Sequence, residues 1–286
     1  SFMIKFVLIF LGIVILFFLI VMVIDTNRFV VKEYKLVTDK VKHRHKFVIL
    51  ADLHGKEYGN GNKKLLKAIE EQNPTGILIA GDMLTAKSGK EFQHVLAFLG
   101  ALSEKYPIFY GNGNHEYRLK IYPETYGTMA KEYNEGLKNR DIFPLCNEST
   151  IVDDENMAIY GLELGREYYK RGKKAPMESQ YMDDMLGKVD KGRYDILLAH
   201  NPDYLKQYAK WGADLVISGH VHGGIMRLPF LGGIIAPSFK IFPKYSGGLY
   251  EEGESKMILS TGLGSHTIPV RVFNPAQLVV LEIDSE

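Results

Sequence analysis

The sequence has a single cysteine, Cys146, and almost no net charge. One cysteine cannot form a disulfide within the chain, so a disulfide-stapled fold is excluded, as is a metal site built from several thiolates. The formal net charge is +1, from 35 Lys and Arg against 34 Asp and Glu. A dedicated nucleic-acid binder needs a basic surplus to neutralise phosphates, so nucleic acid is not expected as a bulk partner.

Internal repeats and low-complexity linkers are also missing. Hydrophobic residues make up 46% of the chain, charged residues 24% and aromatic residues 12%, which are values of a globular protein rather than a disordered or fibrous one. The 286 residues fit one large domain or two small ones.

Charged residues are absent from Phe6 to Ile24. As a helix this stretch would span about 28 Å, close to the thickness of the hydrocarbon core of a bilayer. A signal peptide has a shorter apolar core and a cleavage site of small residues, and the sequence shows neither. We therefore expect a short N-terminal stub at residues 1–5 and an uncleaved transmembrane anchor at residues 6–24, with a buried core helix as the alternative.

The basic residues beside this stretch leave its orientation open. Lys5 precedes it, and seven Lys and Arg residues follow it between Arg28 and Lys46. The positive-inside rule then favours a cytoplasmic domain, but acidic residues are interspersed among these cations. We expect a single-pass membrane protein whose domain lies on either face, with residues 25–46 forming a juxtamembrane segment and first strand region.

Buried strands alternate with amphipathic helices through the rest of the chain. Short apolar runs predict strands at 46–51, 76–80, 107–110, 194–199 and 214–218, a hairpin at 149–161 and several strands within 245–284. Apolar residues at helical spacing predict helices at 90–105, 124–139, 178–189 and 203–211, and one between a cap at Asn62 and Pro74. This alternation predicts one α/β domain with two sheets and outer helices.

Chemically active side chains follow these strands directly. The carboxyl ends of strands in α/β sheets are where binding sites assemble. Five of the nine histidines stand at such ends. They belong to five short motifs, namely Asp52-Leu53-His54, Gly81-Asp82, Gly113-Asn114-His115-Glu116, His200-Asn201-Pro202 and Gly219-His220-Val221-His222-Gly223.

The residue types in these motifs suit a pair of metal ions. Carboxylates and neutral imidazoles bind Zn²⁺, Mn²⁺ and Fe ions. In an extended segment residues i and i+2 point the same way, so Asp52 and His54, or His220 and His222, can face one pocket. Two ions about 3.5–4 Å apart can hold a phosphate and activate a water. Each motif alone is common, but their order after successive strands predicts two divalent ions of Mn, Fe or Zn.

The five motifs, over residues 47–225, resemble the signature of the calcineurin-like metallophosphoesterase superfamily. The tail is similar to the membrane-associated bacterial phosphodiesterase branch, which resembles enzymes acting on UDP-2,3-diacylglucosamine. The segments that carry this second resemblance are 223–230, 245–250, 260–264 and 269–271. The resemblance implies a four-layer αββα sandwich of two mixed sheets, with a metallophosphoesterase domain at residues 47–286.

The resemblance also implies roles for individual residues. It places Asp82 as a bridge between the two ions. His115 would contact the phosphate and assist the leaving oxygen, as a cation or general acid, without binding metal. Glu116 would support His115, or be a surface residue. The first ion would be held by Asp52, His54, Asp82 and His222, and the second by Asp82, Asn114, His200 and His220.

Two further regions are candidates for substrate contact. A basic run after the predicted hairpin would either grip an anionic group or form a solvated loop. Residues 225–243 are apolar and rich in Gly and Pro, and would either meet acyl chains or pack as core strands. The candidate cations of the basic run are Arg166, Lys170, Arg171, Lys173 and Lys174.

These features together predict a dinuclear metal-dependent phosphohydrolase. It would cleave phosphodiester or pyrophosphate bonds with an activated water, on a lipid-linked or nucleotide-linked substrate at the membrane. The alternatives are a phosphomonoesterase or protein phosphatase, and a non-catalytic membrane-anchored scaffold. The expected partners are a phosphate-containing small molecule or lipid and the membrane lipid around the N-terminal helix, and the expected state is a monomer.

Overall fold

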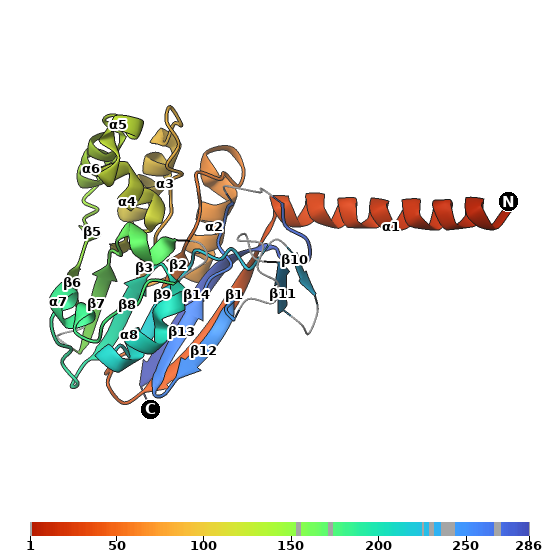
Figure 1. The fold of residues 1–286 in the computed structure, drawn as a ribbon. Coiled ribbons are helices and arrows are strands. Elements are labelled where there is room, and N and C mark those ends of the chain that lie inside the picture. Colours follow the sequence, from red (N-terminus) through yellow and green to blue (C-terminus); the bar gives the residue numbers. More distant parts are fainter. Residues whose placement is uncertain are drawn as a thin grey trace.

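Two mixed six-stranded sheets form the centre of the protein, which was analysed as a computed structural model (Figure 1). The structure describes residues 2–152, 156–170, 174–224, 226–228, 232–235, 244–265 and 270–285. The first sheet has the order β1 (Phe29–Thr38), β14 (Ala276–Ser285), β2 (His45–Leu50), β3 (Gly76–Ala80), β4 (Ile108–Gly111), β5 (Pro144–Leu145). The second has the order β12 (Gly248–Glu252), β13 (Ser255–Leu259), β9 (Leu215–Ser218), β8 (Tyr194–Ala199), β7 (Met157–Leu162), β6 (Glu148–Val152).

Helices cover the outer faces of both sheets, and one helix extends away from them (Figure 1). A separate hairpin pairs β10 (Met226–Leu228) with β11 (Gly232–Ile235). The α-helices are α1 (Phe2–Asn27), α2 (Lys63–Gln72), α3 (Gln93–Ser103), α4 (Asn114–Ile121), α5 (Pro123–Tyr126), α6 (Met129–Lys138), α7 (Tyr181–Leu186) and α8 (Leu205–Trp211). Three short 3₁₀ turns lie at η1 (Asn60–Asn62), η2 (Arg166–Tyr169) and η3 (Pro202–Tyr204).

The alternation of side chains along the central strands produces the four layers. In β2, Phe47 and Ile49 pack between the two sheets. Val48 and Leu50 point to the other face of the sheet, where they pack with residues of α2, α3 and α6. Because successive strand residues point to opposite faces, a strand that is apolar at every position must be covered on both sides. The second sheet repeats this arrangement, with α7 and α8 on its outer face. The predicted αββα sandwich is confirmed.

The first sheet begins with β1, which lies within the predicted first strand region at residues 25–46. Strand β1 pairs in parallel with β14, from Phe29 opposite Ala276 to Thr38 opposite Ser285. The segment expected as a juxtamembrane segment and first strand region therefore contains an edge strand of the first sheet, together with the start of β2 at His45. The sequence does not reveal the pairing of β1 with β14. Many side chains of β1 are exposed, and its partner strand lies at the other end of the chain.

Two helix predictions also differ from the structure. The helix expected at 124–139 is divided into α5 and α6 at Gly127, whose φ of +58° is outside the helical range. Asn62 does not cap α2 through its side chain, because its own backbone is left-handed at φ +58°. Its Oδ1 instead accepts a hydrogen bond from the Tyr58 N–H at 2.8 Å, which closes the loop before the helix.

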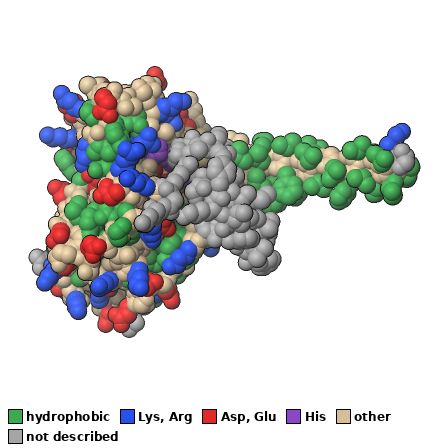
Figure 2. Space-filling view, viewed as in Figure 1, with side chains coloured by type: hydrophobic (Ala, Val, Ile, Leu, Met, Phe, Trp, Pro, Cys, Tyr) green, Lys and Arg blue, Asp and Glu red, His purple; other side chains and the backbone are tan. Residues whose placement is uncertain are grey.

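The N-terminal helix α1 is apolar and exposed along nearly its whole length (Figure 2). Its mean hydropathy over an 18-residue window is 3.6, and none of that window is buried. A helix of this length and composition could cross a membrane, although a signal sequence has the same properties.

Asp195, near the start of β8, makes stability depend on pH. Burial of this side chain, followed by the nearby Asp214 carboxylate, raises the pKa of Asp195 to about 7. An aspartate in an unfolded chain has a pKa of about 3.9, so the folded state binds its proton more tightly. The resulting contribution to the free energy of unfolding is present below pH 4 and is lost as the pH rises through 7.

We expect Asp195→Asn, which imitates the protonated acid, to stabilise the protein above pH 7 by about 1–2 kcal/mol. This gain should disappear towards pH 4. The measurement is the thermal unfolding temperature of the full chain between pH 4 and 8.5, with the exposed Asp284→Asn as the matched control. A gain that stays constant over this range would contradict the assignment.

Candidate metal centre

The five motifs meet where the strands of both sheets end. Asp52 follows β2, Asp82 follows β3, and Asn114 opens α4 directly after β4. The histidines of the second sheet follow β8 and β9. The backbone connects the ends of neighbouring strands, since the Asp52 N–H after β2 donates to the Gly81 carbonyl after β3 at 3.0 Å. Parallel strands thus deliver all the predicted ligands to one edge of the sandwich.

Left-handed turns, rather than extended segments, direct the ligands into the site. The φ angles are +52° at Asp52, +51° at His54, +56° at Asp82, +75° at His220 and +53° at His222. The expectation that the i and i+2 pairs converge because they are extended was therefore wrong in its reason. Non-glycine residues rarely adopt this conformation, and its concentration at one edge is typical of a functional site.

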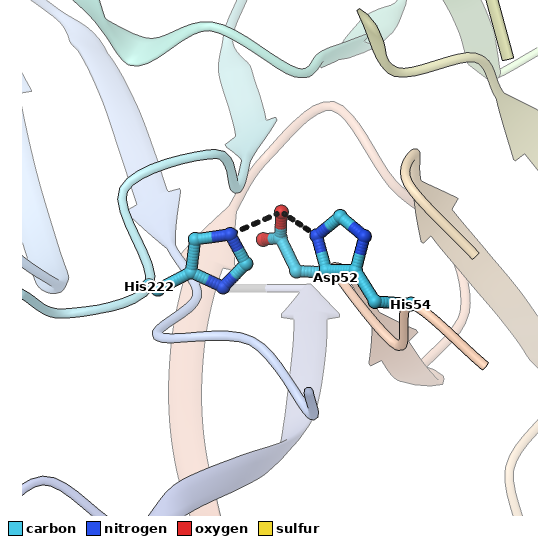
Figure 3. Close-up of side chains that lie close together, drawn as sticks. All are labelled: Asp52, His54 and His222. Carbon is cyan, nitrogen blue, oxygen red and sulfur yellow. Dashed lines mark ion pairs between the residues drawn. The ribbon is translucent and has the colours of Figure 1, made fainter. Parts of the chain in front are cut away.

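One group of ligating atoms consists of Asp52, His54 and His222 (Figure 3). All three side chains are buried, and their ligating atoms lie within 4.8 Å of one another. The Nε2 atoms of His54 and His222 lie 3.7 and 3.5 Å from Asp52 Oδ1. The two imidazoles face the same carboxylate oxygen from opposite sides, which is an arrangement that a divalent ion can occupy.

A second group consists of Asp82, His200 and His220, again within 4.8 Å. The Nε2 atom of His200 lies 3.0 Å from Asp82 Oδ2. The same oxygen is 3.9 Å from His54 Nε2, so Asp82 stands between the two groups. One carboxylate shared by two sets of imidazoles is the arrangement that a bridging ligand requires.

The tautomers of three histidines suit metal binding. Nδ1 of His200 lies 2.6 Å from the Ala80 carbonyl, and Nδ1 of His222 lies 3.2 Å from the Gly264 carbonyl. A carbonyl can only accept, so Nδ1 carries the proton and Nε2 presents its lone pair. Nδ1 of His54 lies 3.2 Å from Thr85 Oγ1, which can accept in the same way.

His115 has the opposite tautomer. The Ala86 N–H donates to its Nδ1 at 2.8 Å, so the neutral ring carries its proton on Nε2. That Nε2 lies 4.0 Å from Asp82 Oδ2, inside the site, and His54, Asp82 and His115 are near enough to form a third possible metal group. In this tautomer, however, His115 offers a donor rather than a lone pair to anything bound there.

Asn114 contributes a buried oxygen without a donor. Its Oδ1 has no hydrogen-bond partner among the residues that the structure describes. The backbone N–H of His115 donates to Asp82 Oδ1 at 2.8 Å, which holds the start of α4 against the Asp82 carboxylate. A buried carbonyl oxygen without a donor is costly, and a cation would satisfy it. The donor set of the site therefore fits divalent metal.

Glu116 supports the turns that carry the ligands rather than the ring of His115. Its carboxylate accepts from the backbone N–H groups of Asp82, Met83 and Gly113 at 2.9–3.0 Å, and from the Tyr110 hydroxyl at 2.8 Å. It is buried, so the surface alternative is excluded. Burial, and then the Asp82 carboxylate, raise the pKa of Glu116 to about 6.

The charges of the site are strongly coupled. Burial opposes ionisation of Asp82, but the imidazoles of His200 and His115 outweigh it and hold the pKa of Asp82 well below its usual range. Burial likewise opposes protonation of His200, yet Asp82 raises the pKa of His200 to about 10. A metal ion at this position would take the place of that proton, so metal binding should release protons.

The basic run contributes an aromatic ring to the site, where the sequence predicted cations. The guanidinium of Arg166 donates to the Tyr122 hydroxyl, and the exposed Lys174 donates to the Asp203 carbonyl. Lys170 is exposed, while Arg171 and Lys173 lie outside the described residues. Among the described residues of the run, Tyr169 reaches the candidate ligands, because its ring centroid lies 5.1 Å from that of His220. Most of residues 225–243, with the predicted acyl contact, also lie outside the described residues.

Arg271 and Asn274 hold the candidate ligand His222, and the sequence did not identify them as part of the site. The Asn274 amide donates to the backbone carbonyls of His222 and Gly224, both at 2.8 Å. The buried Arg271 guanidinium donates to five backbone carbonyls, the closest being Gly264 at 2.8 Å. Arg271 belongs to the tail segment whose likeness to membrane-associated enzymes was noted, but no spacing rule connects it with His222.

Comparison with known proteins agrees with this site. The model of the calcineurin-like phosphoesterase family matches residues 45–224, which include all the predicted ligands. An uncharacterised metallophosphoesterase of Campylobacter jejuni is 30% identical over 88% of this chain and 63% of its own length. The uncharacterised metallophosphoesterase YkuE of Bacillus subtilis is 27% identical over 88% of this chain and 79% of its own.

A relative with a more specific name is the phosphodiesterase YaeI of Escherichia coli. It is 28% identical over 68% of this chain and 65% of its own length. The chain spans 63% of the length of the Campylobacter relative. The family match covers more than half of the chain and contains every motif of the site. The chain therefore belongs to the calcineurin-like phosphoesterase family.

Proposed function

We propose that the protein is a dinuclear metal-dependent phosphohydrolase that cleaves phosphodiester or pyrophosphate bonds at a membrane. The observation that carries this proposal is the position of Asp82 between two groups of imidazoles, with the His115 N–H beside them. In this assignment one ion is held by Asp52, His54, Asp82 and His222, and the other by Asp82, Asn114, His200 and His220.

When bound, two divalent ions would supply the positive charge that lowers the pKa of a water and binds phosphate oxygens. His115 would donate a hydrogen bond from its Nε2–H to a phosphate oxygen or to the leaving oxygen without transferring that proton, and the Ala86 N–H keeps the proton on Nε2. Glu116 would hold the Asp82 and Gly113 turns in place. Tyr169, packed against His220, would close one side of the site against water.

A membrane-borne substrate, lipid-linked or nucleotide-linked, is supported by the exposed apolar helix α1. A diester or pyrophosphate bond is supported by the name of the Escherichia coli relative. The monomeric state and the face of the membrane remain predictions.

The test compares two chromogenic substrates with the full chain in detergent, loaded with Mn²⁺ or Zn²⁺. We expect bis(p-nitrophenyl) phosphate to be hydrolysed faster than p-nitrophenyl phosphate. A preference for the monoester would favour the phosphomonoesterase alternative. Failure to hydrolyse either compound with any of the metals, despite bound metal, would favour a scaffold.

A further inference from the structure

Residues 270–274, which we call the docking segment, touch both the membrane helix and a ligand of the metal centre. The Arg271 backbone N–H donates to Thr26 Oγ1 near the end of α1 at 3.2 Å. The Val272 carbonyl accepts from the Arg227 N–H of β10 at 3.1 Å. Asn274 holds the His222 carbonyl. The apolar helix and the candidate metal centre are thus joined through one short stretch of chain.

Phe273 extends from this segment along the apolar part of α1. Its ring centroid lies 6.2 Å from that of Phe17 and 6.0 Å from that of Phe18. Phe18 precedes Thr26 by two turns of helix, or about 12 Å. The backbone at Phe273 is left-handed, with φ +51°, which is uncommon for an aromatic residue. This turn places the ring beside the apolar stretch, beyond the polar end of the helix.

Polar groups mark where the apolar part of α1 ends. Arg28 pairs with Asp25 at 2.8 Å, and the Lys56 ammonium donates to the Thr26 carbonyl at 3.0 Å. If α1 enters a bilayer, these charges must remain at the level of the lipid headgroups. The rings of Phe17, Phe18 and Phe273 then lie on the acyl side of that level.

We propose that the docking segment is a membrane-contact surface whose partner is the lipid bilayer, with the Phe273 side chain inserted among acyl chains beside α1. The proposal rests on the membrane anchor of the proposed function. It goes further by assigning a second point of insertion at Phe273, which lies near the other end of the chain from α1 but packs against Phe17 and Phe18 of this helix. Figure 2 shows α1 projecting from the domain, as such an arrangement needs.

The contact would fix the metal centre beside the membrane surface. Arg271 donates to the carbonyls of Thr261 at 2.9 Å and Gly264 at 2.8 Å, and the Gly264 carbonyl also lies 3.2 Å from Nδ1 of His222. The segment that contacts lipid through Phe273 is therefore bonded directly to the loops around His222. With two insertion points the domain cannot swing freely about the end of α1, and the site keeps one height above the bilayer.

The chain has a single tryptophan, Trp211, which is first replaced so that it does not contribute to the fluorescence. In the Trp211→Phe background, Phe273→Trp creates one fluorescent reporter in the full chain reconstituted in phosphatidylcholine nanodiscs. We expect lipids with brominated acyl chains to remove most of its emission, and aqueous iodide to have little effect. The matched control is Phe143→Trp in the same background, since Phe143 is 60% exposed beside β5, at the opposite edge of the sheet from β1. It should respond to iodide and not to bromine.

A tryptophan reporter inside α1 distinguishes failure of the docking proposal from failure of the proposed membrane anchor. Phe10→Trp, again without Trp211, should be quenched by brominated lipid if α1 spans the bilayer. Quenching at position 10 without quenching at position 273 would overturn the docking proposal and leave the anchor standing. Quenching at neither position would overturn both.

A second measurement covers the case in which Phe273→Trp disturbs the fold. The only cysteine can be removed as Cys146→Ala, and a nitroxide can then be attached through Phe273→Cys. We expect faster collisional relaxation with oxygen, which concentrates in acyl chains, than with a water-soluble nickel complex. The reverse order would contradict insertion.

Discussion

Asp82→Ala is expected to remove the bound metal together with the activity. Asp82 Oδ2 lies 3.0 Å from His200 Nε2 and 3.9 Å from His54 Nε2, so this carboxylate belongs to both imidazole groups. Its loss deprives each metal position of a ligand and of negative charge at once. We expect metal affinity to fall by more than roughly 100-fold, beyond the usual effect of a supporting residue.

The measurement is metal content by mass spectrometry after dialysis of the full chain, together with calorimetric titration of Mn²⁺ or Zn²⁺. Asp82→Asn is a useful second variant, since its Oδ1 can still accept from the His115 N–H and so preserves the turn. The exposed Asp284→Ala controls for loss of a carboxylate elsewhere. If Asp82→Ala kept the metal content and affinity of the unmodified protein, the shared position of Asp82 would have no role in binding.

His115→Ala is expected to retain the metal but lose turnover, whereas Asp82→Ala should lose both. The Ala86 N–H occupies Nδ1 of His115, so its Nε2 carries a proton and serves as a donor rather than as a ligand. Removing one positioned hydrogen-bond donor to developing charge typically costs between about 100-fold and 1,000-fold in rate. We expect kcat to fall within this range while metal affinity changes by no more than a few-fold.

The check is a parallel measurement of phosphodiester hydrolysis and metal content for His115→Ala and for the exposed control His43→Ala. The control should change neither quantity. Loss of metal from His115→Ala to the extent seen with Asp82→Ala would identify His115 as a ligand. The group formed by His54, Asp82 and His115 would then be the one that binds metal.

The sequence was informative where a candidate ligand directly follows an apolar strand in the chain. An apolar strand followed at once by Asp52, Asp82 or Asn114 is visible in a single short stretch, because a strand end and its side chain are covalent neighbours. The same holds for the apolar helix. The prediction from sequence was wrong where a turn interrupts a helix, as at Gly127. A positive φ within an otherwise helical pattern leaves a single glycine as its only sign in the sequence.

By itself, then, the sequence determined the candidate ligand types, their order after the strands, two sheets with outer helices and the apolar N-terminal helix, and its family resemblance implied the αββα layers. Only the tertiary structure decided that β1 pairs with β14, that Glu116 supports the turn of Asp82, and that Arg271 and Asn274 hold His222. It also decided the tautomer of His115, through the Ala86 N–H. The physical reason is that these properties depend on hydrogen bonds between groups far apart in the chain, whose partners are specified only once the two sheets have packed together.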